Sequence, residues 1–373
     1  MIQRALVVGT APPQVRIAGL GLEERRRLAL ADAGVRVGGE GPGSALVMRA
    51  STFAPPALIA RLARFEPASE EVVATGGAGV RIYVAGAAAV TPLLSDLAAG
   101  REPSSREAPL HEREFVVHVG DQADARRAED LLLKTLLKPS DGLVSRHLNR
   151  HLSLALTRRL VATLVTPNHM TLVAFVIGLA GAAWVYRGGG LSLIGGALLF
   201  QVQSILDGCD GEIARLKHLR SRLGEWLDQV ADDVVNLAFL AAVAVALTRA
   251  GVTWTRPVGW VAAISLVINM VALYAAHATV GGGSGSVTSV RWWGQGAAAK
   301  PAPQTAVARL VRRLQLLFVD LRRRDFFTFF YLLTALVGHI ELAFAWHALI
   351  ALISGVGPAL QWIVAGGPEP APR

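Results

Sequence analysis

The sequence predicts a polytopic α-helical membrane protein with a small α/β domain in front of it. The chain has 373 residues, of which 52% are hydrophobic, and its long apolar segments all follow about residue 165. A membrane-spanning helix needs about 20 predominantly apolar residues. The second part of the chain, residues 136–373, can therefore cross a membrane several times, whereas residues 1–135 have the composition of a soluble domain.

The front domain, residues 1–135, shows alternating strand and helix patterns. Apolar runs typical of buried strands alternate with helical segments in this order: strand 4–10, helix 22–34, strand 44–48, helix 56–65 and strand 80–85. This alternation is typical of an α/β layer with a mostly parallel sheet. We expect a small cytoplasmic α/β domain.

An amphipathic helix is expected in front of the first span. In residues 143–164, leucines and valines recur on one helical face, and the other face is basic, with Arg146, Arg150, Arg158 and Arg159. Such a helix is suited to lie along the membrane surface. The alternative is an ordinary amphipathic helix packed on the front domain.

Six apolar segments predict six transmembrane helices: 168–186, 191–210, 228–248, 257–280, 326–340 and 342–366. The first follows Pro167, a residue that suits an early helical position. The fifth segment is the shortest and is tightly linked to the sixth through Gly338. Acidic residues stand at the end of the second segment and at the start of the third.

The basic residues predict the orientation, because short loops rich in Lys and Arg stay in the cytoplasm. The loops on one side carry Arg146, Arg150, Arg158, Arg159, Arg215, Lys217, Arg220, Arg222, Arg291, Lys300, Arg309, Arg312, Arg313, Arg322, Arg323 and Arg324. The opposite loops carry Arg187, Arg249 and Arg256. We therefore expect an integral protein of the cell inner membrane, with both termini and the acidic residues on the cytoplasmic side.

The formal net charge of +9 fits this location, because a basic residue beside anionic lipid contributes about 1 kcal/mol. The front domain lacks the interleaved aromatic and basic residues of a nucleic-acid-binding surface. We expect membrane lipid as a partner and no nucleic acid. The sequence leaves a homodimer open.

Four acidic residues stand at the membrane boundary: Asp207, Asp210, Asp228 and Asp232. Ionised residues at such depth cost roughly 2.5 to 3.5 kcal/mol each by insertion scales unless they are paired or bind a metal. The separations of three and four residues place each pair on one helical face. Carboxylates suit Mg²⁺ or Mn²⁺, which commonly bind substrate phosphates as well. The alternative is a solvated acidic loop.

The residues around these acids are suited to a phosphate ligand. Gly211 and Gly224 let a bulky ligand approach the backbone, and Arg215 offers a fixed fork of donors. Asn168, in the entry to the first span, can either contact the ligand or cap its helix. Both roles for Asn168 remain open.

The stretch resembles the signature of the CDP-alcohol phosphotransferase (CDP-alcohol phosphatidyltransferase) family. Its fixed positions are met by Asp207, Asp210, Gly211, Ala214, Arg215, Gly224, Asp228 and Asp232. The resemblance implies that a CDP-linked alcohol binds among these residues and Asn168, its diphosphate lying on Mg²⁺ or Mn²⁺ held by the aspartates. It also implies that Asp232 is the general base, that an acceptor hydroxyl attacks the phosphorus next to the donor alcohol, and that CMP leaves.

The run Arg322-Arg323-Arg324-Asp325-Phe326-Phe327 is similar to that of family members that use inositol phosphate. The resemblance implies that Arg323 and Arg324 bind a phosphate on the acceptor, a phosphorylated polyol. Anchoring of the topology by positive charge is the other explanation. The donor is left open between CDP-diacylglycerol and a soluble CDP-polyol such as CDP-inositol, because both share the CDP end.

The whole chain resembles the fusions of an inositol-phosphate cytidylyltransferase with a di-inositol-phosphate phosphate synthase. The front domain departs from the nucleotidyltransferase pattern. Its first loop contains Pro12 and Pro13, which lack backbone amides, and no acid follows the strand 44–48. We expect a degenerate domain kept for docking. The alternatives are a bifunctional enzyme that also makes the CDP-alcohol from CTP, a non-catalytic membrane scaffold, and an ion carrier.

Overall fold

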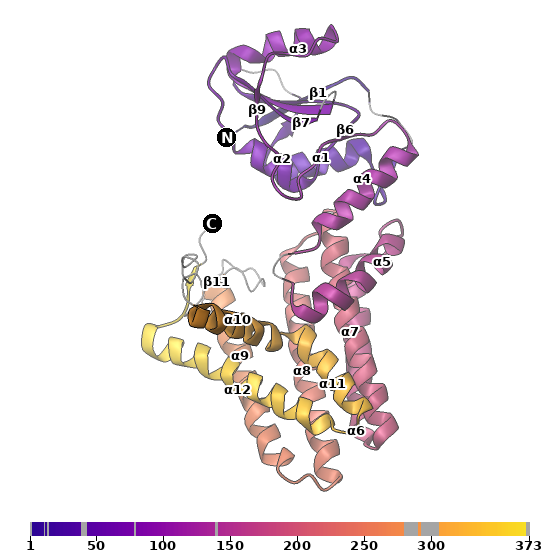
Figure 1. Ribbon diagram of the computed structural model, residues 1–373, viewed down its shortest axis with the longest axis vertical. Coiled ribbons are helices and arrows are strands. Elements are labelled where there is room, and N and C mark those ends of the chain that lie inside the picture. Colours follow the sequence, from indigo (N-terminus) through magenta and orange to yellow (C-terminus); the bar gives the residue numbers. More distant parts are fainter. Residues whose placement is uncertain are drawn as a thin grey trace. The chain divides into compact units, whose positions relative to one another are not determined.

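The computed structural model describes residues 2–10, 12, 15–38, 43–77, 80–138, 141–279, 290–291 and 306–370. The chain forms two compact units (Figure 1). The first comprises Met1–Pro139 with the short segments Val161–Thr163 and Leu216–His218. The second comprises Ser140–Leu160, Leu164–Arg215 and Leu219–Arg373.

The first unit contains a six-stranded sheet. Its strands are β1 (Arg4–Val8), β4 (Arg36–Val37), β5 (Ala45–Arg49), β7 (Val72–Gly77), β8 (Val80–Ala85) and β9 (Arg106–Glu107), in the order β4-β1-β5-β8-β7-β9. Only β8 runs antiparallel to its neighbours, β5 and β7, among the pairings of this sheet. The sheet is mostly parallel, as predicted, with β8 as its one antiparallel strand. Short strands β2 (Arg16–Ile17) and β3 (Leu20–Gly21) pair with each other, as do β6 (Thr52–Phe53) and β10 (Val117–His118).

Helices cover both faces of this sheet. They are α1 (Leu22–Asp32), α2 (Pro56–Ala63), the short 3₁₀ turn Ala87–Ala89 and α3 (Val90–Ala98), whereas a further helix, α4 (Gln122–Thr135), contacts β2. Alternate residues of β5 point to opposite sides: Leu46 packs in one core with Leu58 of α2, and Val47 packs in another with Leu93 of α3. The helices predicted at 22–34 and 56–65 are confirmed as α1 and α2. The helices α3 and α4 were not predicted.

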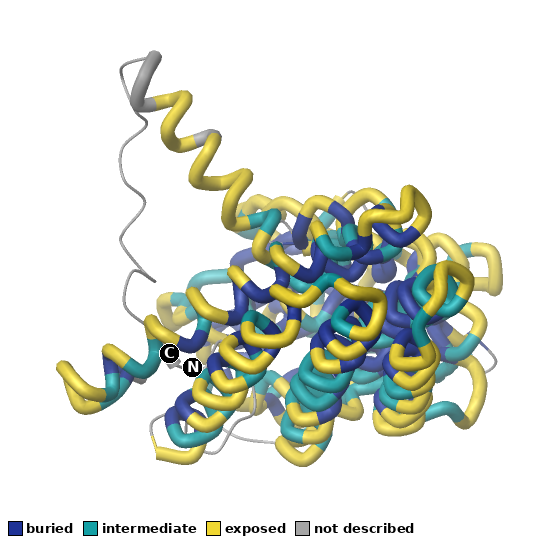
Figure 2. Tube along the Cα trace, turned by 90° about the horizontal axis from the view of Figure 1, so that it is seen from below, coloured by how far each residue is buried: buried dark blue, intermediate teal, exposed yellow. Residues whose placement is uncertain are grey.

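The second unit begins with a single-turn π-helix, Ser145–Asn149, which continues as α5 (Arg150–Leu160). Five of its described helices are long and apolar enough to cross a membrane: α6 (Pro167–Arg187), α7 (Gly190–Leu216), α8 (Arg222–Arg249), α9 (Thr255–Thr279) and α12 (Ile340–Ala365). Buried residues gather between these helices and exposed residues lie outside (Figure 2). The outer positions are apolar, as at Leu172, Val176, Trp260 and Ile264. The chain is an integral membrane protein.

The predicted count of six spans is not confirmed. The fifth predicted segment forms α11 (Arg324–Leu336), which has only 13 residues. At 1.5 Å per residue it is about 20 Å long, which is shorter than the hydrocarbon core of about 30 Å. Short strands β11 (Val290–Arg291) and β12 (Glu369–Pro370) pair with each other in the same unit.

Two further features of the second unit differ from the expectation. The helices α7 and α8 extend beyond the predicted spans, so that the acidic residues lie inside them and not at their ends. The start of α8 is fixed by Ser221, whose Oγ accepts a hydrogen bond of 3.0 Å from the backbone N–H of Gly224. A helix that was not predicted, α10 (Ala306–Leu321), precedes α11.

Candidate functional site

Three carboxylates from two helices converge in the second unit. Asp207 and Asp210 come from α7 and Asp228 from α8, and one ligand atom of each lies within 4.8 Å of the others. The spacing of three residues places the first two on one face of α7. A group of three carboxylate oxygens matches the ligand type that Mg²⁺ or Mn²⁺ prefers.

The surroundings of the trio are consistent with a bound cation. Asp210 is held in place by Thr171, whose Oγ1 donates a hydrogen bond of 2.6 Å to Oδ2, and by the backbone N–H of Gly211. Oδ1 of Asp228 is buried and has no hydrogen-bond partner in the described part of the chain. A buried carboxylate oxygen without a partner is costly unless a cation or donor binds it. These residues therefore fit a divalent metal.

The fourth aspartate, Asp232, lies one turn beyond Asp228 on α8 but is not part of the trio. It forms an ion pair with Nη1 of Arg324 and accepts a hydrogen bond of 3.3 Å from Nε2 of Gln203. Arg324 also lies 3.5 Å from Oδ2 of Asp207 and donates a 2.7 Å hydrogen bond to Oε1 of Gln203. The guanidinium thus sits between the metal trio and Asp232.

The remaining residues of the signature lie on the same two helices. A Cβ atom at Gly211 would lie 3.3 Å from Nη1 of Arg215, and one at Gly224 would lie 3.3 Å from Oδ1 of Asn168. Both glycines thus keep space open beside a polar side chain. Nε of Arg215 is buried without a partner among the described residues, and Ala214 is partly buried. Whether these residues bind CDP remains a prediction.

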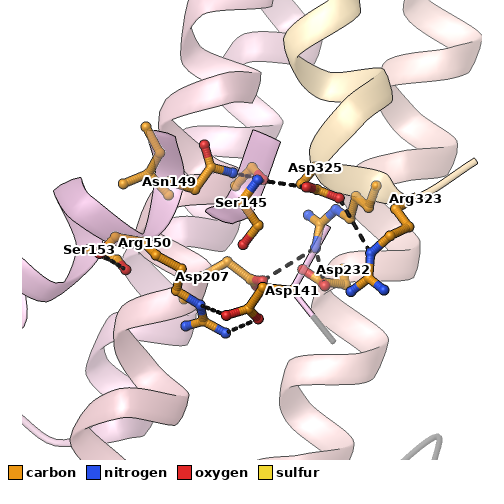
Figure 3. Close-up of a pocket in the computed structure, with 13 residues that line it drawn as sticks. Asp141, Ser145, Asn149, Arg150, Ser153, Asp207, Asp232, Arg323 and Asp325 are labelled. Carbon is orange, nitrogen blue, oxygen red and sulfur yellow. Dashed lines mark hydrogen bonds and ion pairs between the residues drawn. The ribbon is translucent and has the colours of Figure 1, made fainter. Parts of the chain in front are cut away.

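A polar cavity of about 230 Å³ adjoins the aspartates (Figure 3). Asp207 and Asp232 form part of its wall, and so do both arginines that the sequence singled out, Arg323 and Arg324. Most of the other lining side chains are polar as well: Asp141, Ser145, Asn149, Arg150, Ser153, Ser204 and Asp325, together with Ile205 and Gly208. A ligand in this cavity would therefore lie beside the metal trio and be surrounded by hydrogen-bonding groups.

The three arginines of the run 322–324 differ in their positions. Arg323 and Arg324 line the cavity, whereas Arg322 is exposed and does not. Nε of Arg323 lies 3.7 Å from Oδ1 of Asp325. Asp325 in turn accepts a 2.7 Å hydrogen bond from the backbone N–H of Ser145, so that the start of α11 is tied to the π-helix. The role of Arg323 and Arg324 in acceptor binding stays a prediction.

Glu212 is a site residue that the sequence analysis missed. It occupies a variable position of the signature and is fully buried. Its carboxylate accepts hydrogen bonds of 2.7 to 2.8 Å from Arg150, Ser153 and Thr157, all on α5. The amphipathic pattern of residues 143–164 assigned Arg150 to a solvated basic face, and only its buried partner on α7 shows otherwise.

Arg150 connects Glu212 to the cavity wall. Its Nε and Nη2 atoms donate hydrogen bonds of 3.1 to 3.2 Å to the carboxylate of Asp141. Burial lowers the pKa of Arg150, but the hydrogen bonds and charge attraction from Asp141 and Glu212 are stronger and raise the pKa above its ordinary value. The guanidinium therefore stays charged. A buried network of this kind fixes its members only while each polar group has a partner.

A second polar chain orients an amide in the cavity wall. Nε2 of Gln201 donates a hydrogen bond of 2.8 Å to Oδ1 of Asn149, and Nδ2 of Asn149 donates one of 3.3 Å to Oγ of Ser204. The amide of Asn149 is therefore fixed in one direction. The wall presents an oriented hydroxyl group at Ser204, which suits recognition of a hydroxylated ligand.

Comparison with known proteins identifies the second unit. The family model of the CDP-alcohol phosphatidyltransferases matches residues 164–356. A protein of Aquifex aeolicus named "Bifunctional IPC transferase and DIPP synthase" is 39% identical over 134 residues, which cover 36% of this chain and 30% of the relative. A protein of Thermococcus kodakarensis with the same name is 42% identical over 124 residues, or 33% of this chain and 28% of the relative.

A relative with another name matches a similar share of the chain. The CDP-diacylglycerol–serine O-phosphatidyltransferase of Mycobacterium leprae is 34% identical over 108 residues, which cover 29% of this chain and 34% of the relative. The chain thus spans about a third or less of the length of each of these curated relatives. The shared part establishes a family and leaves the substrates to be argued from the site.

Proposed function

Because the chain belongs to the CDP-alcohol phosphatidyltransferase family, we propose that it transfers a substituted phosphate group from a CDP-linked alcohol to an acceptor hydroxyl, with release of CMP. The observation that carries this proposal is that the metal trio and the polar cavity lie side by side and share one residue. Asp207 belongs to the metal trio and also lines the polar cavity, together with Asp232. A donor held at the trio would therefore meet an acceptor in the cavity.

The trio and its neighbours would bind the donor in this reaction. Asp207, Asp210 and Asp228 would hold Mg²⁺ or Mn²⁺, which neutralises the negative charge of the donor diphosphate. Gly211 and Gly224 leave space for the diphosphate, and Arg215 offers donors to it. Asn168 lies beside Gly224, which supports a contact with the nucleotide.

Asp232 is the proposed general base. It takes the proton from the acceptor hydroxyl, whose oxygen attacks the phosphorus bonded to the donor alcohol. The bond from that phosphorus to the bridging oxygen breaks, and CMP leaves with this oxygen. Arg324 and Gln203 hold the carboxylate of Asp232 in position. A general base must lie within hydrogen-bond reach of the proton it accepts, and the position of Asp232 in the cavity wall supports this role.

The cavity favours a phosphorylated polyol as acceptor. Arg323 and Arg324 supply charge for a phosphate, and Ser145, Asn149 and Ser204 supply partners for hydroxyl groups. A small amino-acid acceptor would offer no phosphate to the two arginines and fewer hydroxyl groups to the polar wall, and so would make fewer charge-assisted hydrogen bonds. The names of the Aquifex and Thermococcus relatives point the same way. Inositol phosphate is the acceptor we propose, with either CDP-diacylglycerol or CDP-inositol as donor.

We place the site on the cytoplasmic side of the inner membrane, with both termini on that side. The many basic residues near the site support this orientation. It requires that α11 and α12 form a hairpin that enters and leaves on the same side. Their contact is supported by the hydrogen bond of 3.2 Å between the hydroxyl of Tyr331 and Nδ1 of His347.

The front unit, in this proposal, is a degenerate nucleotidyltransferase-like domain that serves in docking. The residues after β5 are Ala50 and Ser51, so this strand does not lead to an acidic metal ligand. The alternative is a bifunctional enzyme, as the names of two relatives suggest. Incubation with CTP, Mg²⁺ and inositol 1-phosphate distinguishes them: we expect no CDP-inositol, and its formation would establish the bifunctional reading.

Release of CMP tests the transferase reaction against the non-catalytic alternatives. Purified protein with Mg²⁺, a CDP-linked donor and inositol phosphate should release CMP, and chelation of the metal should stop the release. A membrane scaffold or an ion carrier would release none with any donor. The Asp228→Asn variant is the matched control for contaminating hydrolases, because it removes one carboxylate and keeps the shape of the side chain.

A further inference from the structure

The helix α10 (Ala306–Leu321) has an apolar face that packs against nothing in the described part of the chain along most of its length. Leu310, Val311, Leu314 and Leu317 recur with helical spacing, and their side chains are 46 to 57% exposed. Every residue at 309–312 and 314–319 is exposed. A helix of 16 residues with such a face is not stable in water by itself.

The opposite face of α10 is basic. Arg309 and Arg312 stand on it, on the side away from Leu310 and Leu314, together with the exposed Leu316 and Val319. A helix with a row of large apolar residues on one face and its arginines on the other is typical of helices that lie in a membrane interface and bind anionic lipid. A helix that bound another protein helix would not need a row of arginines along its other face.

The direction of α10 fits this placement. In Figure 1 it runs crosswise to the spanning helices α7 and α8, and in Figure 2 it projects sideways from the bundle, exposed along nearly its whole length. Its end is fixed to a spanning helix, because Nε1 of Trp346 on α12 donates a 2.9 Å hydrogen bond to the carbonyl of Leu321. The ring of Phe318 also contacts Trp346, with centroids 6.2 Å apart.

We propose that α10 is an interfacial helix that binds the anionic lipid surface on the side of the active site. Leu310, Val311, Leu314 and Leu317 enter the boundary of the acyl chains, and Arg309 and Arg312 contact acidic headgroups. The depth of α10 relative to the active site is fixed by its last residue, Leu321. Arg324, three residues further on, contacts Asp232. The inference does not rest on the proposed reaction.

The full-length protein in lipid nanodiscs tests this. Leu314 is replaced by cysteine and labelled with an environment-sensitive fluorophore; Cys209 is fully buried, and the unmodified chain measures its background labelling. In discs with about a third phosphatidylglycerol we expect a blue-shifted emission and quenching by lipid-borne spin labels, both reduced by salt. In pure phosphatidylcholine discs we expect a larger fraction of water-exposed label.

Charge variants complete the test. Each basic residue at an anionic surface contributes about fivefold to partitioning, so Arg309→Gln with Arg312→Gln should lower the ratio of lipid-bound to water-exposed label in anionic discs roughly thirtyfold. The double Lys variant keeps the charge and should retain binding, and Arg187→Gln, at the end of α6, should change nothing. A label whose emission is independent of lipid charge and salt, whether because it is exposed or because protein covers it, would overturn the proposal.

Discussion

Asp207, Asp210 and Asp228 act as one unit in this account, because each supplies an oxygen to the same point. Replacing any of them by Asn removes a charged ligand and keeps the volume. We expect Mn²⁺ affinity and turnover to fall by about a hundredfold or more, since loss of even indirect ligand support costs 10 to 100-fold. Metal titration followed by electron paramagnetic resonance measures the affinity, and circular dichroism checks the fold.

Asp233 provides the matched control for this prediction. It neighbours Asp232 on α8, but its carboxylate accepts hydrogen bonds from Gln229 and Tyr274 and is not part of the trio. Asp233→Asn should leave metal affinity within about twofold of wild type, since a neutral amide oxygen can still accept both bonds. If Asp233→Asn lost as much metal affinity as the variants of the trio, the trio would not be the metal site.

Arg323 and Arg324 are expected to bind the acceptor phosphate through their fork of donors. Lysine keeps the charge but loses the bidentate geometry. At least one of Arg323→Lys and Arg324→Lys should raise the acceptor KM roughly tenfold or more, because a hydrogen bond to a charged group contributes about 1.5 to 3 kcal/mol. In Arg323→Lys the KM for the CDP donor should not change, because Arg323 pairs with Asp325, whereas Arg324 also lies 3.5 Å from Asp207 of the trio.

Arg322 is the control that the structure supplies for this pair. It is exposed and does not line the cavity, so Arg322→Lys should behave like wild type in steady-state kinetics. If both Arg323→Lys and Arg324→Lys kept wild-type acceptor kinetics, the cluster would serve only to anchor the topology.

Glu212 is a positioning residue in this account, because it touches α5 and lines no part of the cavity. Glu212→Gln keeps the size but replaces the charge that Arg150 binds. We expect loss of about 1.5 to 3 kcal/mol of stability, seen as a lower Tm, and a raised acceptor KM with an unchanged donor KM. The control is Glu341→Gln, at the distant start of α12, where Glu341 pairs with His339.

Structural damage alone would give a different result for Glu212→Gln. A general loosening of the fold would lower kcat for every substrate. It would leave the ratio of the acceptor KM to the donor KM unchanged. A variant with lower Tm and an unchanged acceptor KM would contradict the positioning role of Glu212.

At the level of elements, the sequence predicted what depends on local pattern. The order of spans and the helices α1 and α2 followed from periodicity and from glycine or proline at their ends. The two acidic pairs could be placed on helix faces by spacing alone. The convergence of α7 and α8 depends on tertiary packing, as does the burial of Glu212, and neither leaves a pattern in one segment.

The differences between the expected and the observed elements have physical reasons. The apolar run of α11 continues past Leu336 in the sequence, but Gly338, with φ +80°, ends the helix there. In the sequence of α10 the arginines indicate a basic cytoplasmic loop, and the helical spacing of its leucines is a weaker signal. The antiparallel β8 could not be told from a parallel strand, because direction in a sheet is set by the connections and not by composition.

The hairpin of α11 and α12 gives a prediction at this scale. If both helices cross the membrane, the turn that joins them lies on the outer side. Val337 is 68% exposed in this turn, so a cysteine at this position should react with a membrane-impermeant maleimide on intact cells. Reaction only after the membrane is permeabilised would place the turn inside and leave the protein with five spans.

At the scale of the whole molecule, the chain consists of a membrane bundle, whose acids and cavity form one site, and a front unit in which no acid follows β5 directly. The bundle contains the match to the family model. The central claim is therefore that the bundle joins a CDP-linked alcohol to a phosphorylated polyol.

Product identification by mass spectrometry tests this claim most directly. Purified full-length protein is incubated with Mg²⁺, CDP-inositol or CDP-diacylglycerol, and inositol phosphate labelled with ¹⁸O on its phosphate. The account predicts CMP and a phosphodiester product that retains the labelled phosphate, formed by the wild type and not by Asp228→Asn. Products without the labelled phosphate, or CMP release that does not depend on the acceptor, would contradict it.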